Sequence, residues 1–159
     1  MFKYKKILIA VFTAFIGIFS SCEIDTPIIT VSSEDQIQAY LTANNLTTIA
    51  QKTDSGLYYI IEDEGIGPNP SAGATVSIHY RGTLVDGTVF DSSYERGKPT
   101  DLSLNSVILG WQEGIPLFKK GGRGSLIIPF ELAYGSRGNG DIPPNTIILF
   151  DIELIDFDN

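Results

Sequence analysis

The feature that most limits the fold is a series of short alternating segments separated by glycine- and proline-rich loops, from residue 56 to the C-terminus. In "TVSIHYRG", residues 75–82, apolar and polar residues alternate, so Val76, Ile78 and Tyr80 share one face of an extended strand. The segment "TIILFDIELIDF", residues 146–157, alternates in the same way. Asp86-Gly87 is typical of a tight turn between two strands. The sequence therefore predicts a small antiparallel sheet.

Two short segments predict helices. In "SSEDQIQAYLTANN", residues 32–45, Ser33 is the expected cap, and Ile37, Tyr40 and Leu41 share one helical face. The segment "GWQEGIPLF", residues 110–118, predicts the one helix of the second half. The fold class is α+β, an antiparallel sheet with a single brief helix in its main domain. We expect the first helix to pack on its own domain, and a role as an adapter or dimerisation element stays open.

The N-terminus has the order of an export signal. Lys3, Lys5 and Lys6 precede the apolar residues 7–19, and two serines then lead to Cys22, the single cysteine. The apolar run is shorter than the about 20 residues of a typical transmembrane helix. This order resembles the lipobox of bacterial lipoproteins, in which the cysteine is lipidated and becomes the first residue of the mature chain. An uncleaved signal anchor is the competing interpretation.

These patterns divide the chain into three parts. We expect a lipoprotein signal peptide over residues 1–21, a tether with a short helix over 22–50 and a globular domain over 51–159. The implied location is the bacterial cell envelope, with a lipid anchor in the outer membrane and the domain either periplasmic or surface-exposed. Attachment to the lipid membrane would come from the acyl chains.

Composition and motifs exclude several classes of function. The net charge of −8 and the lack of a basic stripe argue against nucleic-acid binding. The segment "HYRGTLVDGTVFDSS", residues 79–93, gathers acid–base and nucleophilic side chains, but His79 is the only histidine and alternation directs it away from the apolar face. No "GxSxG" elbow occurs, and one histidine and one cysteine cannot complete a tetrahedral zinc site. We therefore expect neither a hydrolase nor a metal centre.

Four blocks carry a specific resemblance. "VSIHYRGTLVDGTVFDSS", "GWQEG", "AYG" and "IPPNTIILFDIELI" occur in the order and spacing of the FKBP-type peptidyl-prolyl isomerases, over roughly residues 56–157. The resemblance implies an FKBP-like half-barrel around one short helix, isomerase activity on Xaa-Pro bonds and no cofactor. It implies proline-containing polypeptides as substrates and the macrolide inhibitors of the family as ligands.

The same resemblance implies the residues of the site. Tyr80, Asp91, Trp111 and Tyr134 would be catalytic, with Trp111 as the floor under the prolyl ring and the Tyr134 hydroxyl as a hydrogen-bond donor. Asp91 would pair with the Tyr80 hydroxyl and Arg96. Substrate binding would fall to a further set: Phe90, Arg96, Val107, Ile108, Ile142 and Phe150, with the Ile108 N–H holding a substrate carbonyl. Thr100 stands where the family often carries an aromatic residue, so one wall would be thinner.

Rotation about an Xaa-Pro bond needs no nucleophile, because the barrier of about 18–20 kcal/mol comes from amide resonance. A dry aromatic cavity removes the water that stabilises the planar, polarised amide and can hold the twisted form more tightly. The sequence thus predicts an isomerase that accelerates folding of exported proteins. The alternative is a non-catalytic chaperone or adapter that binds proline-containing segments.

Overall fold

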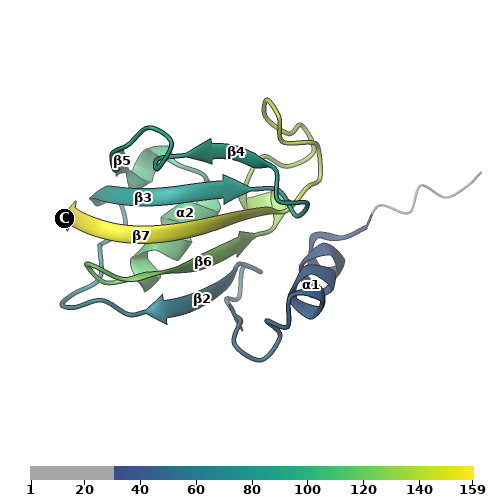
Figure 1. Cartoon of the computed structure of the whole chain (residues 1–159), viewed down its shortest axis with the longest axis horizontal. Coiled ribbons are helices and arrows are strands. Elements are labelled where there is room, and N and C mark those ends of the chain that lie inside the picture. The colour runs from purple at the N-terminus through teal and green to yellow at the C-terminus, as the bar shows by residue number, and fades with distance from the viewer. Residues whose placement is uncertain (1–30) are drawn as a thin grey trace, which may run out of the picture.

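The structure is a computed structural model and describes residues 31–159 (Figure 1). The expected signal peptide and Cys22 lie outside the described residues. One antiparallel sheet of seven strands dominates, in the order β1-β2-β6-β7-β3-β4, with β5 also pairing with β3. The strands are β1 (Gln51–Lys52), β2 (Tyr58–Asp63), β3 (Thr75–Thr83), β4 (Val89–Ser92), β5 (Thr100–Ser103), β6 (Arg123–Ile128) and β7 (Ile148–Asp158).

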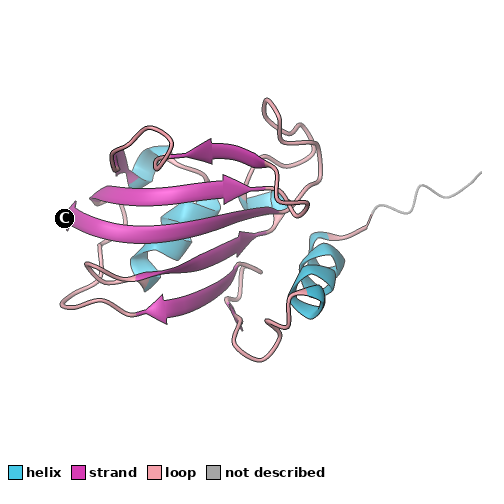
Figure 2. Cartoon of the chain, in the orientation of Figure 1, coloured by secondary structure: helices cyan, strands magenta, loops and turns pink. Residues whose placement is uncertain are grey.

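Helices cover both faces of this open sheet (Figure 2). Within residues 31–159 the two α-helices are α1 (Ser33–Ala43) and α2 (Leu109–Gly114). Three short 3-10 helices complete the list: η1 (Leu104–Ser106), η2 (Ile115–Leu117) and η3 (Phe130–Leu132). The α+β class and the short helix of the second half are as predicted. That helix gives way to η2 near Pro116, because proline lacks the N–H that would continue the α-helical pattern.

Strand β3 organises the sheet. It pairs with β7 along its whole length, from Thr75 opposite Asp158 to Thr83 opposite Leu149. On its other edge, β5 pairs with the first half of β3 and β4 with the second half. The chain between these two strands, residues 93–99, therefore leaves the sheet beside the middle of β3. The loop formed by residues 93–99 places Arg96 in contact with Tyr80.

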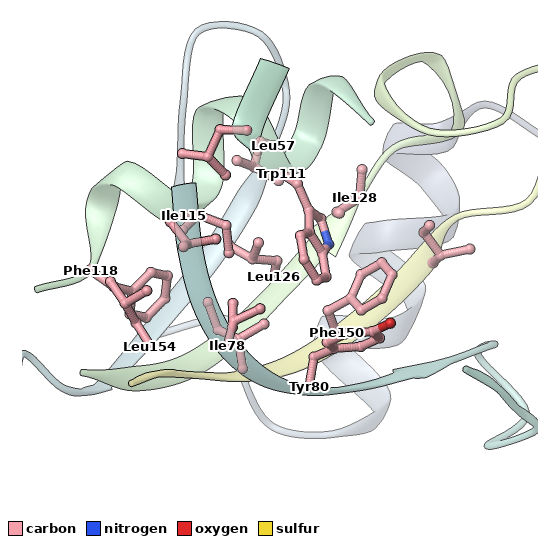
Figure 3. Close-up of a cluster of buried hydrophobic side chains, with 14 of the residues drawn as sticks. Leu57, Ile78, Tyr80, Trp111, Ile115, Phe118, Leu126, Ile128, Phe150 and Leu154 are labelled. Carbon is pink, nitrogen blue, oxygen red and sulfur yellow. The ribbon is translucent and has the colours of Figure 1, made fainter. Parts of the chain in front are cut away.

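The alternation read from the sequence matches the burial along β3 and β7. Val76 and Ile78 are fully buried on the face that α2 covers, and Tyr80 follows them on the same face. Trp111 and Ile115 of the helical segment pack against this face, as Figure 3 shows. Two polar neighbours on β3, Ser77 and His79, point to the other side and are partly exposed. The main core thus lies between α2 and the sheet.

Helix α1 packs on the opposite face of the sheet. Its buried residues Ile37 and Leu41 contact Tyr58 and Ile60 of β2 and Ile127 of β6. The neighbours of Ile127 in β6 belong to the core under α2, so successive side chains of this strand serve two separate clusters. The helix is therefore part of the folded unit, as expected, although it lies in the stretch assigned to a tether.

The cap of α1 was predicted one residue too late. Ser32, not Ser33, is the N-cap, and its side chain accepts a hydrogen bond from the Asp35 N–H at 3.1 Å. The Ser32 hydroxyl also donates to the Asp35 carboxylate at 2.7 Å, which makes the exchange reciprocal. The helix ends at Ala43 with Asn44 as its C-cap, and Asn45 takes a left-handed conformation with φ of 58°.

Over residues 31–159, no helix has both the length and the apolar character needed to cross a membrane. In the same part of the chain, no group of three or more histidine, cysteine, aspartate or glutamate side chains is placed to hold a metal ion.

Candidate functional site

One cavity of about 530 Å³ opens between the sheet, α2 and the loop that follows η3. It gathers side chains from β3, β4, β5, β7, the start of α2 and the loop. Nine of the ten site residues implied by the sequence that lie in the described region line it: Tyr80, Phe90, Asp91, Val107, Ile108, Trp111, Tyr134, Ile142 and Phe150. The tenth, Arg96, lies beside the cavity in contact with Asp91 and Tyr80.

Aromatic rings form the base of the cavity. The Trp111 ring lies 5.0 Å from both Tyr80 and Phe150, at interplanar angles of 86° and 78°. Phe90 meets Phe150 edge-on at 5.5 Å. Figure 3 shows the Trp111, Phe150 and Tyr80 rings gathered at one end of the core. Such edge-to-face contacts fix ring orientations, so the base is a rigid apolar surface.

The indole N–H of Trp111 is unusual. It is buried, and it has no hydrogen-bond partner among the residues that the structure describes. Most buried polar groups are paired, and unpaired ones concentrate at binding and catalytic sites. The floor of the cavity therefore carries one unused donor within an otherwise apolar ring system.

A polar triad closes one edge of the cavity. The Tyr80 hydroxyl donates to Asp91 Oδ2 at 2.6 Å and accepts from Arg96 Nη2 at 2.7 Å. Arg96 Nη1 also pairs directly with Asp91 Oδ1. The guanidinium also reaches Thr100 Oγ1 at 3.1 Å, so the threonine ties Arg96 to β5 at a position where the family often carries an aromatic residue. The contacts of Asp91 with Tyr80 and Arg96 are the ones implied by the resemblance.

The triad also shifts the titration of its members. Burial alone would raise the pKa of Asp91, but hydrogen bonds from Tyr80 and Arg96 and the nearby guanidinium charge together hold that pKa below 3.8. Burial, followed by the hydrogen bond to Asp91, raises the pKa of Tyr80 above 10.0. At neutral pH the carboxylate is therefore ionised and the phenol is protonated, which suits a fixed wall better than proton transfer.

The entrance to α2 supplies a backbone donor. Ile108 precedes the helix, and its carbonyl accepts from the Trp111 and Gln112 N–H groups at 2.9 and 3.1 Å. No hydrogen bond within residues 31–159 uses the Ile108 N–H. The Tyr134 hydroxyl, from the loop on the far side of the cavity, is likewise unused within that range. Besides the buried indole N–H of Trp111, these two donors thus remain available at a cavity whose base is mostly apolar.

The remaining polar side chains of residues 79–93 serve the fold. His79 Nδ1 lies 2.9 Å from Ser93 Oγ, and the imidazole stacks on Tyr94 at 4.6 Å. Ser93 is fully buried, accepts from the Tyr80 N–H at 2.8 Å and donates to the Tyr80 carbonyl at 3.2 Å. These bonds replace missing strand pairs where the chain leaves the edge of β3. No catalytic triad is present in this segment.

The matching family model is that of the FKBP-type peptidyl-prolyl cis-trans isomerase, over residues 67–155. The chain belongs to this family. It is 54% identical over 109 residues to an FKBP-type isomerase, FkpA, from Buchnera aphidicola subsp. Schizaphis graminum, covering 68% of this chain and 43% of the relative. The chain thus spans less than half the length of that curated relative.

Solved structures confirm the FKBP-like fold. The crystal structure of FkpA from Escherichia coli matches with a TM-score of 0.73 and 41% identity, over 79% of this chain and 59% of that one. A peptidyl-prolyl cis-trans isomerase from Pseudomonas syringae pv. tomato matches with a TM-score of 0.70 and 31% identity, over 80% of this chain and 94% of that one. The sheet of the FKBP domain here is open, not a closed barrel.

Five lining residues were not anticipated from the sequence: Leu102, Ser106, Asn139, Gly140 and Asp141. Leu102 could have been found, because it lies two residues after Thr100 on β5 and therefore on the same face. It supplies apolar surface to the wall that was expected to be thin. The three loop residues carry no periodic signal, because a glycine-rich loop takes its path from tertiary contacts.

Proposed function

We propose that this chain is a peptidyl-prolyl cis-trans isomerase that accelerates Xaa-Pro rotation during the folding of exported proteins. The observation that carries the proposal is the rigid aromatic base beside two unused hydrogen-bond donors in one cavity. Membership of the FKBP family supports the same conclusion. Uncatalysed isomerisation takes tens to hundreds of seconds, slow enough to limit folding.

The proposed mechanism uses binding alone. The prolyl ring would lie on the indole of Trp111, where surrounding rings exclude water from the amide. The Ile108 N–H and the Tyr134 hydroxyl would hold substrate carbonyls while the bond turns. Loss of solvation destabilises the planar amide relative to the twisted one, and each ~1.4 kcal/mol of that difference is tenfold in rate. No covalent intermediate is required.

The direct test is a protease-coupled assay of the purified full-length chain with an Xaa-Pro peptide. We expect the rate of cis-to-trans conversion to rise linearly with protein concentration. Binding of the peptide, followed by Trp111 fluorescence, should saturate as the peptide concentration is raised. Saturable binding without acceleration would support the non-catalytic chaperone or adapter instead.

The activity should be independent of pH between about 5 and 9. Asp91, with its lowered pKa, is ionised across this range, and Tyr80, with its raised pKa, is protonated. The lowered pKa of Asp91 also stabilises the folded state, and this stabilisation is complete above the pKa that Asp91 has in the unfolded chain. It is lost as the pH falls through the pKa of Asp91 in the folded state, which lies below 3.8. Exchange NMR on a proline peptide measures the isomerisation rate across this pH range without a protease. A change in activity within this pH range would contradict the assignment of a wall without proton transfer.

We further propose that Cys22 carries a lipid anchor in the bacterial cell envelope. Support comes from the basic, apolar and small-residue order before this single cysteine. Cells producing the chain should incorporate labelled palmitate, and Cys22→Ser should abolish the label while leaving isomerase activity unchanged. Label retained in the serine variant would refute the anchor. Protease treatment of intact cells would then separate periplasmic from surface-exposed positions.

A further inference from the structure

Helix α1 precedes the family match at residues 67–155 but contacts the segment that carries the cavity loop. The contact runs through the side chain of Gln36. Its Nε2 donates to the Asn145 carbonyl at 2.9 Å, and its Oε1 accepts from the Ile147 N–H at 3.3 Å. One amide therefore satisfies a backbone acceptor and a backbone donor on the same stretch of chain.

Asn145 is the closing residue of the cavity loop. Its N–H donates to the Gly135 carbonyl at 2.9 Å, directly after Tyr134. It also has φ of 53°, a left-handed conformation that asparagine adopts more readily than other non-glycine residues. The loop closed by this bond, residues 135–145, includes the lining residue Ile142. Gln36 thus holds the base of a loop whose two sides reach the cavity.

Helix α1 is a firm support for this contact. Ile37, next to Gln36, is fully buried, and Leu41 is nearly so. At the start of the helix, Glu34 accepts from the Tyr58 hydroxyl at 2.8 Å and pairs with Lys52 at 2.9 Å. These bonds fix α1 to β1 and β2 independently of the cavity loop. Because α1 is held on the sheet, its contact through Gln36 resists movement of the cavity loop.

We propose that Gln36 is a positioning residue that sets the placement of Tyr134 and Ile142 by fixing the base of the 135–145 loop. Gln36 does not line the cavity. Its effect on isomerisation rests on the proposed function, whereas its effect on the loop does not. Loss of both hydrogen bonds would let the loop base open and would weaken substrate binding more than turnover.

The test compares two glutamines of the same helix in the full-length chain. Gln36→Met keeps side-chain length and helix propensity but removes both bonds to the loop, together with a bond from Nε2 to the Val31 carbonyl at 3.3 Å. The matched control is Gln38→Met, because Gln38 bonds only Glu34 and Tyr58 and does not contact the loop. The expected result for Gln36→Met is roughly fivefold faster hydrogen exchange at the Asn145 and Ile147 amides, with a roughly fivefold higher KM and little change in kcat. The control should leave all of these unchanged within about twofold.

A second variant guards against misfolding. Gln36→Glu keeps the acceptor for Ile147 but loses the donor to Asn145, so it should show a partial effect with a native melting curve. Unchanged exchange at both amides in Gln36→Met would overturn the proposal. Faster exchange with unaltered KM would overturn the link between loop and site. An inactive wild-type chain would refute the proposed function, and exchange at the two amides would still decide whether Gln36 positions the loop.

Discussion

Replacing Asp91 by alanine is expected to lower kcat/KM for Xaa-Pro isomerisation by roughly tenfold or more, the equivalent of at least about 1.4 kcal/mol. Asp91 is the common partner of the Tyr80 hydroxyl and the Arg96 guanidinium. Its removal leaves a cation beside an apolar cavity without its counter-charge, and leaves the phenol without its acceptor. The cavity wall then becomes more polar and less rigid, which opposes desolvation of the amide. The protease-coupled assay measures this loss directly.

The matched control is Asp101→Ala. Asp101 is exposed on β5, close in sequence to the triad, and does not line the cavity. We expect its kcat/KM to remain within about twofold of the wild-type value, since an isolated surface charge contributes little. Asp91→Asn should fall between the two, because the amide keeps an acceptor for Tyr80 but no charge for Arg96. Equal activity of the two alanine variants would remove Asp91 from the site.

Replacing Gly124 by alanine should produce the largest loss of stability, about 3 kcal/mol or more in the free energy of unfolding. A Cβ at this position would lie 2.0 Å from the Ile60 carbonyl oxygen, a backbone atom that cannot turn away. Gly124 lies between Ile61 of β2 and Ile152 of β7, so β6 is held from both sides. Relief requires the β2–β6 pairing to open. Urea unfolding measures the loss from the shift in midpoint.

The control for backbone strain is Gly87→Ala. Gly87 has φ of 87° and open space around its Cα, so alanine there costs only about 1–2 kcal/mol of conformational energy. A clash with backbone should cost more than strain in an exposed turn. A midpoint shift for Gly124→Ala no larger than that for Gly87→Ala would show that β6 moves more easily than the sheet pairing implies.

The sheet could be predicted because its signals are local. Alternation along residues 75–82 already separates Val76, Ile78 and Tyr80 from the opposite face, and buried faces in the structure follow that division. The ring set of the cavity was not derivable in this way, since a buried Trp or Phe reads equally well as core. Its members came from the resemblance, and the structure places them together around one cavity.

Contacts between distant parts of the chain account for what was missed. Gln36 contacts a loop 109 residues later in the sequence, and no spacing rule links the two. The same holds for Asn139 and Asp141, whose approach to the cavity depends on how η3 and β7 direct the loop between them. The prediction of Ser33 as the cap of α1 was wrong for a smaller reason. Two consecutive serines offer the same signal, and only local geometry decides that Ser32 is the cap.

The double-sided burial of β2 and β6 limits how the chain can be shortened. A fragment beginning at residue 51 would keep every strand yet leave Tyr58, Ile60 and Ile127 facing water, because it lacks α1 and the following Leu46 and Ala50, which pack on that cluster. A contiguous apolar surface of this kind drives self-association. Recombinant versions that begin at residue 51 should therefore precipitate or oligomerise, whereas those that start before Ser32 should remain monodisperse.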